Sequence, residues 1–186
     1  RYADELGLPC LKVQHDHDHI ASVMAEYGLR EKVLGIAYDG TGLGSDGKIW
    51  GAEFLLADLK DFQRLGHLKY VPLPGGDLAV KHPFRTALGF IYPNMHRFSK
   101  YIERLDGEQV KIIINQIERK VNAPLASSMG RLFDAVASII NLRDTVDYEG
   151  QAALELESLI LPTNDCYGYR IEREGTGFFI DVDVLL

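Results

Sequence analysis

Cysteine is scarce in this chain, which has only two among its 186 residues, Cys10 and Cys166. Two cysteines so far apart match neither a disulfide framework nor a cysteine-based metal site. No stretch approaches about 18 consecutive apolar residues, and no basic segment followed by an apolar core opens the sequence. These absences predict a soluble protein in a reduced, cytoplasmic setting, with neither a membrane partner nor export.

Basic residues are also in short supply. Lys and Arg number 20 against 27 Asp and Glu, which gives a formal net charge of −7. Proteins that hold nucleic acid by its phosphates usually carry a clustered excess of Lys and Arg. The charge balance therefore argues against a nucleic-acid partner, but it leaves open a free nucleotide bound together with a metal. The hydrophobic content of 46% is enough for a core in one domain or in two small lobes.

The order of local patterns predicts a mixed α/β (α+β) fold. Two strand-like runs flank a glycine-rich segment and predict a β-hairpin over 33–59, and a third strand is possible within 64–77. Apolar residues at three- and four-residue spacing then predict a block of helices. Its segments are 77–92, 108–121, 127–142 and 149–160. The alternating tail, 167–186, predicts two strands around a Glu-Gly-Thr-Gly turn.

Histidine is concentrated at the start of the first helical pattern. Residues 12–29 read KVQHDHDHIASVMAEYGL, with three histidines and two aspartates in five positions. On a helix, His15 and His19 are four residues apart, so they share a face and could bind one cation. Residues 16–18 would point elsewhere, as outer groups or into solvent. The alternative is a polar helix start, at which the carboxylates interact with the helix dipole and no metal binds.

A second polar cluster follows in YDGTGLGSDG, residues 38–47. Here Asp39 is expected at the end of a strand, before a glycine-rich turn whose backbone N–H groups could approach a phosphate. Asp39 could complete a site of two imidazoles and one carboxylate, or orient a metal-bound water. The competing interpretation is a hairpin that needs glycine only for its turn.

Five blocks of the sequence, taken in order, resemble the hydrogenase-maturation carbamoyltransferase family, HypF. They are VQHDHDHIASVMAEYGL, IAYDGTGLGSDGKIWGAEFLL, LKYVPLPGGDLAVKHPFR, NAPLASSMGRLFDAVASIINL and YEGQAALELE. The resemblance is to the large C-terminal domain of that family, which is related to tRNA threonylcarbamoyl transferases. It implies part of one carbamoyl-transfer domain, an incomplete actin/sugar-kinase-like (ASKHA) fold. The approximate lobes would be 1–76, 77–160 and 161–186.

The resemblance also implies an activity. In the family, a YrdC-like domain makes carbamoyl-adenylate from carbamoyl phosphate and ATP, and the domain seen here passes the carbamoyl group to the C-terminal cysteine thiol of HypE. That step belongs to the synthesis of cyanide ligands for nickel–iron hydrogenases. His15, His19 and Asp39 match the family's ligands for a divalent metal, which could be zinc, iron, manganese or magnesium. The acceptor thiol comes from HypE, so no nucleophile is expected in this chain.

Nucleotide contacts are implied at further positions of the matching blocks. The turn after Asp39 would lie along the phosphates of ATP or carbamoyl-adenylate, at Gly40, Thr41, Gly42 and Gly44. The SSMGRLFDAVA block would place Gly130 and Asp134 near the sugar, and the YEGQAA block would place Glu149 and Gly150 on the adenosine side.

Simpler alternatives exist for several of these residues. Asp134 could occupy an exposed position of a core helix, and Gly150 could be an ordinary helix-start glycine. Arg85 could contact carbamoyl or phosphate and take part in catalysis beside Asp39, or it could form a salt bridge at the rim. The remaining single histidines are expected to be structural or solvated. They are His67, His82 and His96.

Two departures from the family pattern bear on function. The family usually reads His-His-x-Ala-His, whereas Asp16 and Asp18 stand at the second and fourth positions here, which makes the local potential more negative and favours cations. The family's upstream zinc-finger, acylphosphatase-like and YrdC-like domains, and a downstream Gly-Gly-rich block, have no counterpart in this sequence. The expectation is therefore a fragment that is inactive alone. The alternatives are a non-catalytic module that binds metal or nucleotide or docks a partner, and a relative of the tRNA threonylcarbamoyl transferases, against which the PLPGGD block argues.

Overall fold

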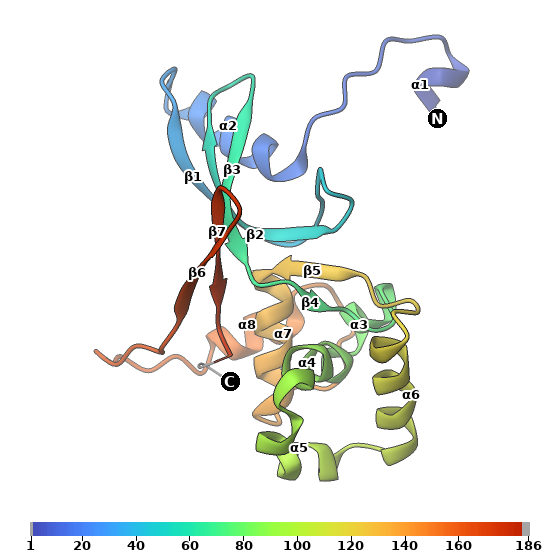
Figure 1. Ribbon diagram of the computed structural model, residues 1–186. Helices are drawn as coiled ribbons and strands as arrows, with labels where there is room; N and C mark the ends of the chain where they lie inside the picture. Colours follow the sequence, from blue (N-terminus) through green and yellow to red (C-terminus); the bar gives the residue numbers. More distant parts are fainter. Residues whose placement is uncertain (1, 184–186) are drawn as a thin grey trace.

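A mixed sheet lies above a block of helices in the structure, a computed structural model that describes residues 2–183 (Figure 1). The strands are β1 (Val33–Leu43), β2 (Ile49–Ala57), β3 (Phe62–Leu68), β4 (Val71–Pro72), β5 (Leu125–Ser128), β6 (Arg170–Glu174) and β7 (Gly177–Asp181). The helices are α1 (Tyr2–Glu5), α2 (His15–Glu26), α3 (Asp77–Lys81), α4 (Pro83–Ile91), α5 (Ser99–Arg104), α6 (Gly107–Glu118), α7 (Met129–Ile139) and α8 (Gln151–Glu157), with a 3-10 helix η1 (Tyr92–Phe98).

The seven strands form one sheet in the order β4-β5-β2-β3-β7-β6, and β1 pairs with β2 outside this path. Strand β2 pairs with β1 and β3 in antiparallel fashion and with β5 in parallel. Strand β7 runs parallel to β3 and antiparallel to β6. The predicted hairpin over 33–59 and the two predicted tail strands are thereby confirmed, as is the mixed α/β class. The sheet takes strands from the first half of the chain, from the helical block and from the tail.

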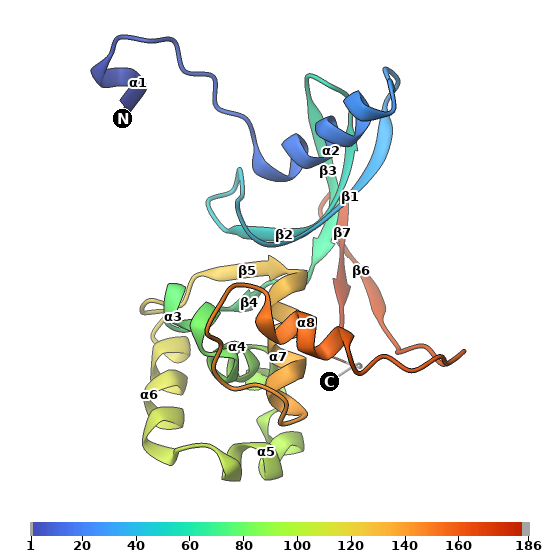
Figure 2. The same cartoon turned by 180° about the vertical axis from the view of Figure 1, so that it is seen from behind.

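Helix α2 packs across one face of the β1–β2 hairpin (Figure 2). It begins after Gln14, whose side chain accepts a hydrogen bond from the backbone N–H of His17 at 2.7 Å and so satisfies one of the free donors of the first turn. Ile20 and Met24, on its inner face, are buried in one cluster with Trp50 and Leu55 of β2. This packing places the N-terminus of α2, with its histidines, beside the far part of β1.

The helical block is built on α4, α6 and α7, whose apolar faces meet in the largest core cluster, which includes Leu88, Ile113 and Leu132. One helix was predicted over 77–92, and this is wrong. The chain breaks at His82, whose backbone is extended (φ −128°, ψ 82°), between α3 and α4. Pro83 explains the break, because the residue before a proline is disfavoured in helical conformation.

The other helical segments agree with the sequence more closely, with two differences. The segment predicted as a helix over 127–142 begins at Met129, because 125–128 forms β5 and pairs with β2 and β4. Residues 93–104, for which no helix was predicted, belong to η1 and α5. Among residues 2–183, no helix is both long and apolar enough to cross a membrane.

Candidate metal and phosphate site

Two histidines and one carboxylate converge where α2 meets β1. His15 Nε2 lies 2.8 Å from Asp39 Oδ2 and 3.2 Å from His19 Nε2. The distance from His19 Nε2 to Asp39 Oδ2 is 4.0 Å, and all three atoms lie within 4.8 Å of one another. Donor atoms about 2 Å from a tetrahedral ion lie roughly 3.3 Å apart, so this set fits a divalent cation. The three side chains are partly exposed, which leaves room for a further ligand.

Asp39 sits in a bulge within β1. The β1–β2 register shifts between the pairs Tyr38–Ala52 and Gly42–Trp50, so three residues of β1 face the single residue Gly51 of β2. The expected placement at the end of a strand is therefore wrong, since β1 continues to Leu43 and the hairpin turn follows it. A bulge re-aims the side chain it carries. The backbone N–H of Gly40 donates a hydrogen bond to Asp39 Oδ1 at 2.6 Å, while Asp39 Oδ2 faces the histidines.

Residues 16–18 point away from the ligand atoms, as expected, but two of them are not in solvent. Asp16 is fully buried; its Oδ2 accepts a hydrogen bond from Gln14 Nε2 at 2.6 Å, and its Oδ1 has no partner. His17 is buried, with its Nε2 2.7 Å from the carbonyl of Asp58. Asp16 also touches β1, because a Cβ on Gly42 would lie 3.2 Å from Asp16 Oδ2 and 3.0 Å from His15 Cδ2. A side chain at 42 would therefore push against the start of α2.

The N-terminus of α7 lies against the same bulge. Ser128 Oγ is 3.0 Å from the carbonyl oxygen of Asp39 and 2.6 Å from that of Gly40, and it accepts a hydrogen bond from the N–H of Arg131 at 3.1 Å. A Cβ on Gly130 would lie 2.9 Å from Gly40 Cα. Gly40 and Gly130, for which the family resemblance implied separate phosphate and sugar positions, are thus in direct contact.

Asp134 lies one turn further along α7 and is only 4% exposed, so the alternative of an exposed position is wrong. Its Oδ2 is 3.0 Å from Arg131 Nη1, although neither atom meets hydrogen-bond geometry. Burial raises the pKa of Asp134 to about 6, and the charge of Arg131 offsets only part of that effect. The carboxyl group consequently titrates within a physiologically accessible range.

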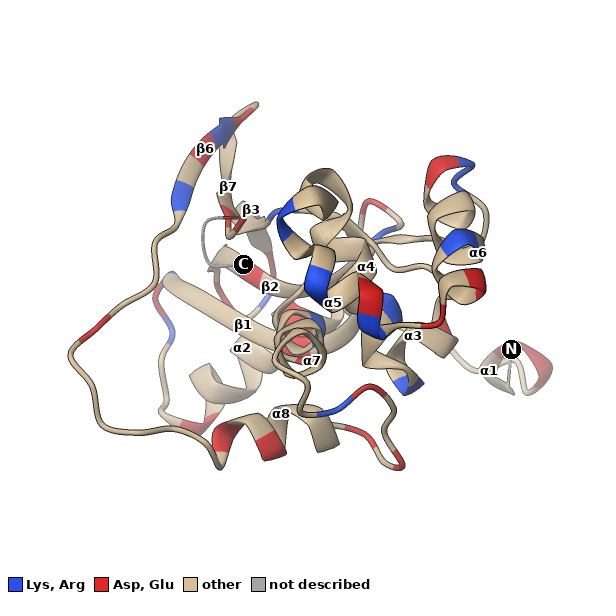
Figure 3. Ribbon diagram, turned by 90° about the horizontal axis from the view of Figure 1, so that it is seen from below, with Lys and Arg blue, Asp and Glu red and all other residues tan. Residues whose placement is uncertain are grey.

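The other predicted site residues lie around or beyond this centre. Thr41 is exposed in the bulge, and Gly44 closes the hairpin turn by a hydrogen bond to the carbonyl of Lys48. Glu149 is exposed, and Gly150 precedes α8 with φ +76°, a left-handed conformation that favours glycine. Acidic residues occur along α8 and in the segments flanking it (Figure 3).

Arg85 lies on α4 against the PLPGG loop. Its Nε donates to the carbonyl of Pro74 at 2.9 Å, and its Nη2 donates to Gln116 Oε1 at 2.6 Å. Burial lowers the pKa of this guanidinium. Both contacts are to neutral groups, and they tie the loop to α4 and α6. The structure does not bring Arg85 into the cluster of candidate metal ligands.

Sequence reasoning missed a buried polar network beneath the hairpin. Glu53 of β2 is fully buried and receives hydrogen bonds from Arg64 Nε at 2.6 Å and from Ser127 Oγ at 2.6 Å. Burial raises the pKa of Glu53, and Arg64 opposes that shift. A charged residue within the apolar run of β2 was the available signal, because a buried carboxylate needs partners. Ser128 and Arg131 were overlooked as well, although both lie in the SSMGRLFDAVA block.

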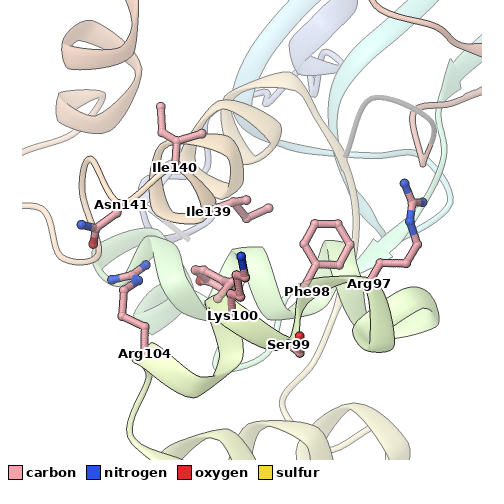
Figure 4. A pocket seen from close by; sticks show the side chains of 9 residues that line it. Arg97, Phe98, Ser99, Lys100, Arg104, Ile139, Ile140 and Asn141 are labelled. Atoms are coloured by element: carbon pink, nitrogen blue, oxygen red, sulfur yellow. The ribbon is translucent and has the colours of Figure 1, made fainter.

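Two pockets of the described residues are lined by none of the three candidate metal ligands. One, of about 490 Å³, is formed by η1, α5 and the C-terminal end of α7, with Arg97, Lys100 and Arg104 around Ile139 and Ile140 (Figure 4). The second, of about 300 Å³, is mostly apolar and lies between Tyr38, Met129 and the segment at Tyr167–Tyr169.

Comparison with known proteins decides the family. Residues 35–186 match the family model described as "Carbamoyltransferase, Kae1-like Domain, second subdomain". The chain belongs to the HypF carbamoyltransferase family. It is 46% identical over 164 residues to carbamoyltransferase HypF2 of Cupriavidus necator, an alignment that covers 86% of this chain and 20% of that protein. It is 42% identical to carbamoyltransferase HypF of Synechocystis, over 97% of this chain and 26% of that protein.

Solved HypF structures share the fold. A crystal structure of full-length HypF in the phosphate- and nucleotide-bound form matches with a TM-score of 0.95 and 54% identity, over 99% of this chain and 24% of that one. The crystal structure of T. kodakarensis HypF matches with a TM-score of 0.79 and 38% identity, over 96% of this chain and 25% of that one. The chain therefore spans about a quarter of these HypF proteins.

Proposed function

We propose that this chain forms the part of a carbamoyltransferase that holds the phosphate end of carbamoyl-adenylate, from which the carbamoyl group passes to the C-terminal cysteine thiol of HypE. The observation that carries the proposal is the convergence of His15, His19 and Asp39 on one point beside a glycine bulge. Membership of the HypF family supports it, and so does the phosphate- and nucleotide-bound form of a similar HypF structure. The product would serve the synthesis of cyanide ligands for nickel–iron hydrogenases.

In this reaction a bond forms between the thiolate sulfur and the carbamoyl carbon, and the bond from that carbon to the adenylate phosphate oxygen breaks. AMP leaves with the electron pair, and the thiol proton passes to solvent. A divalent cation held by His15, His19 and Asp39 would neutralise charge on the leaving phosphate and polarise the carbamoyl carbonyl. Three protein ligands leave coordination positions for a substrate, as in catalytic metal sites.

The residues of the chain would bind and orient the substrate. Residues 40–42, in and directly after the bulge, carry no side chain except that of Thr41, so a phosphate could approach their backbone closely. The positive end of the α7 dipole, which Ser128 fixes against the bulge, favours an anion in the same place. The chain spans only 20% to 47% of the length of its HypF relatives. We therefore propose that the adenylate is formed by a YrdC-like domain outside these 186 residues.

The experiment is a carbamoyl-transfer assay with the full-length protein that carries this chain, supplied with ATP, carbamoyl phosphate and HypE. Thiocarbamate on the HypE terminus is measured by mass spectrometry. Asp39→Asn should lower the rate strongly with the fold retained, whereas Asp165→Asn, at an exposed position of the segment after α8, should not. Equal rates for Asp39→Asn and wild type would remove Asp39 from the mechanism.

The same assay distinguishes the alternative of a non-catalytic module that only binds metal or nucleotide, or docks HypE. The isolated 186 residues, supplied with preformed carbamoyl-adenylate, should transfer nothing. Full activity of the isolated chain would contradict the view that transfer needs residues outside it, and absence of transfer by the full-length protein would favour the non-catalytic alternative.

A further inference from the structure

Arg131 is a buried cation that leaves much of its hydrogen-bonding capacity unused. Its side chain is 5% exposed, and its Nε and Nη1 atoms have no hydrogen-bond partner among the described residues. A guanidinium offers five N–H donors, and donors buried without an acceptor destabilise the fold. The carboxylate of Asp134 balances its charge at 3.0 Å without accepting a well-directed hydrogen bond.

The guanidinium lies against the bulge that carries Asp39. Arg131 Nη2 is 3.3 Å from the position that a Cβ of Gly40 would occupy, so it borders the backbone directly after the metal ligand. Arg131 also belongs to the first turn of α7, an eleven-residue helix whose N-terminus Ser128 caps. Two sources of positive potential, the helix dipole and a buried arginine, therefore face the same side of the bulge.

We propose that Arg131 binds a phosphate oxygen of a ligand that lies along the bulge, between the N-terminus of α7 and the cluster of His15, His19 and Asp39. Phosphate fits because its oxygens accept paired hydrogen bonds from a guanidinium, and because the N-terminus of α7 lies beside this guanidinium. Asp134 then supplies the counter-charge beside the guanidinium. The identity of the phosphate as that of an adenylate rests on the proposed function, while the phosphate site itself does not.

The test is calorimetric titration of the chain, treated with a chelator so that no metal can bridge to the ligand. Three probes are used: inorganic phosphate, AMP and adenosine. Arg131→Gln should weaken the binding of AMP and inorganic phosphate by about 10-fold to 100-fold, since a hydrogen bond to a charged group is lost, and should leave any binding of adenosine unchanged. Arg131→Lys should give an intermediate loss, because it keeps the charge but not the paired donors.

Arg143→Gln is the matched control. Arg143 forms an ion pair of 2.6 Å with Glu155 beyond the other end of α7, so the variant removes the same charge without touching the bulge. Its phosphate affinity should equal that of the wild type. If Arg131→Gln fails to fold, the wild-type protein still gives an answer, because the NMR signal of the Arg131 Nε–H group should shift during titration with inorganic phosphate.

The outcomes separate this inference from the proposed function. Equal phosphate affinity in wild type and Arg131→Gln, an unmoved Arg131 signal, or a wild-type chain that binds neither phosphate nor AMP would overturn the inference. Binding of AMP that depends on Arg131, in a full-length protein that transfers no carbamoyl group, would support the inference and contradict the proposed function. Binding of inorganic phosphate but not AMP would place a free phosphate in the site and support the inference alone.

Discussion

Gly130 and Gly40 touch backbone to backbone: a Cβ on Gly130 would lie 2.9 Å from Gly40 Cα and 3.4 Å from the carbonyl oxygen of Asp39. The backbone at the start of α7 and the backbone of the β1 bulge are therefore in direct van der Waals contact. Real Cβ atoms do not approach other heavy atoms so closely. The position of the Asp39 carboxylate thus depends on a residue 91 positions away that has no side chain.

The first prediction tests this contact. Gly130→Ala should destabilise the protein by about 1–3 kcal/mol, as is usual for an added group in a packed site, and should weaken metal binding because Asp39 moves. Gly107→Ala is the matched control: Gly107 starts α6 with nothing within 4 Å of its added Cβ, so the variant should stabilise the protein by up to about 1 kcal/mol. Urea unfolding measures both. Equal shifts for the two variants would show that the close contact is unimportant.

The second prediction concerns the cation. Zinc or manganese should bind the wild-type chain in calorimetry with one ion per chain, and His15→Ala with His19→Ala should abolish binding, because one carboxylate alone holds a divalent ion weakly. His96→Ala removes an exposed histidine of η1 and should bind as the wild type does. Retained affinity in the double variant would rule out the site, and anomalous scattering from crystals would then locate the ion elsewhere.

The third prediction is a pH dependence of stability. The pKa of Asp134 is raised by burial from 3.8 to about 6, so between these values the native state holds a proton that the unfolded chain has lost. Stability from this group is present at low pH and falls as the pH rises from about 4 through about 6, by about 3 kcal/mol in all. Asp134→Asn cannot titrate, so its free energy of unfolding should lack this fall.

The measurement is urea unfolding of wild type and Asp134→Asn at a series of pH values. Asp134→Asn also leaves Arg131 without a counter-charge, which lowers the free energy of unfolding by the same amount at every pH. The comparison therefore uses only the slope of the free energy of unfolding against pH. Asp165→Asn, at an exposed position, should give a curve parallel to that of the wild type. Parallel curves for Asp134→Asn as well would show that the carboxyl group keeps an ordinary pKa.

Local patterns predicted those parts of the site that a single element determines. The four-residue spacing of His15 and His19 was sufficient to place both on one face of α2, because a helix repeats every 3.6 residues. Pro83 was an equally local signal for the break between α3 and α4, and the helical spacing over 77–92 concealed it. The five sequence blocks led to the correct family, since their order along the chain is far more specific than any one of them.

Features that depend on pairing could not be predicted in this way. The bulge at Asp39 arises from the register between β1 and β2. The glycines after Asp39 are compatible both with an open turn and with a bulged strand, so they could not distinguish the two. Strand β5 has four residues, too few for a period, and exists because β2 and β4 flank it. An exposed position was considered for Asp134 because its neighbours in the sequence of α7 are apolar. In the fold Asp134 is buried, and the ion pair with Arg131 balances its charge.

The hydroxyl of Ser128 contacts the carbonyls of Asp39 and Gly40 and also accepts the N–H of Arg131 at the first turn of α7. A local fluctuation that frees the bulge must therefore also fray a helix whose inner face lies in the main core. Such an opening is rare, because its free energy approaches that of unfolding a core element. The bulge that carries Asp39 is thus formed before any ligand arrives, and binding loses little entropy in ordering it.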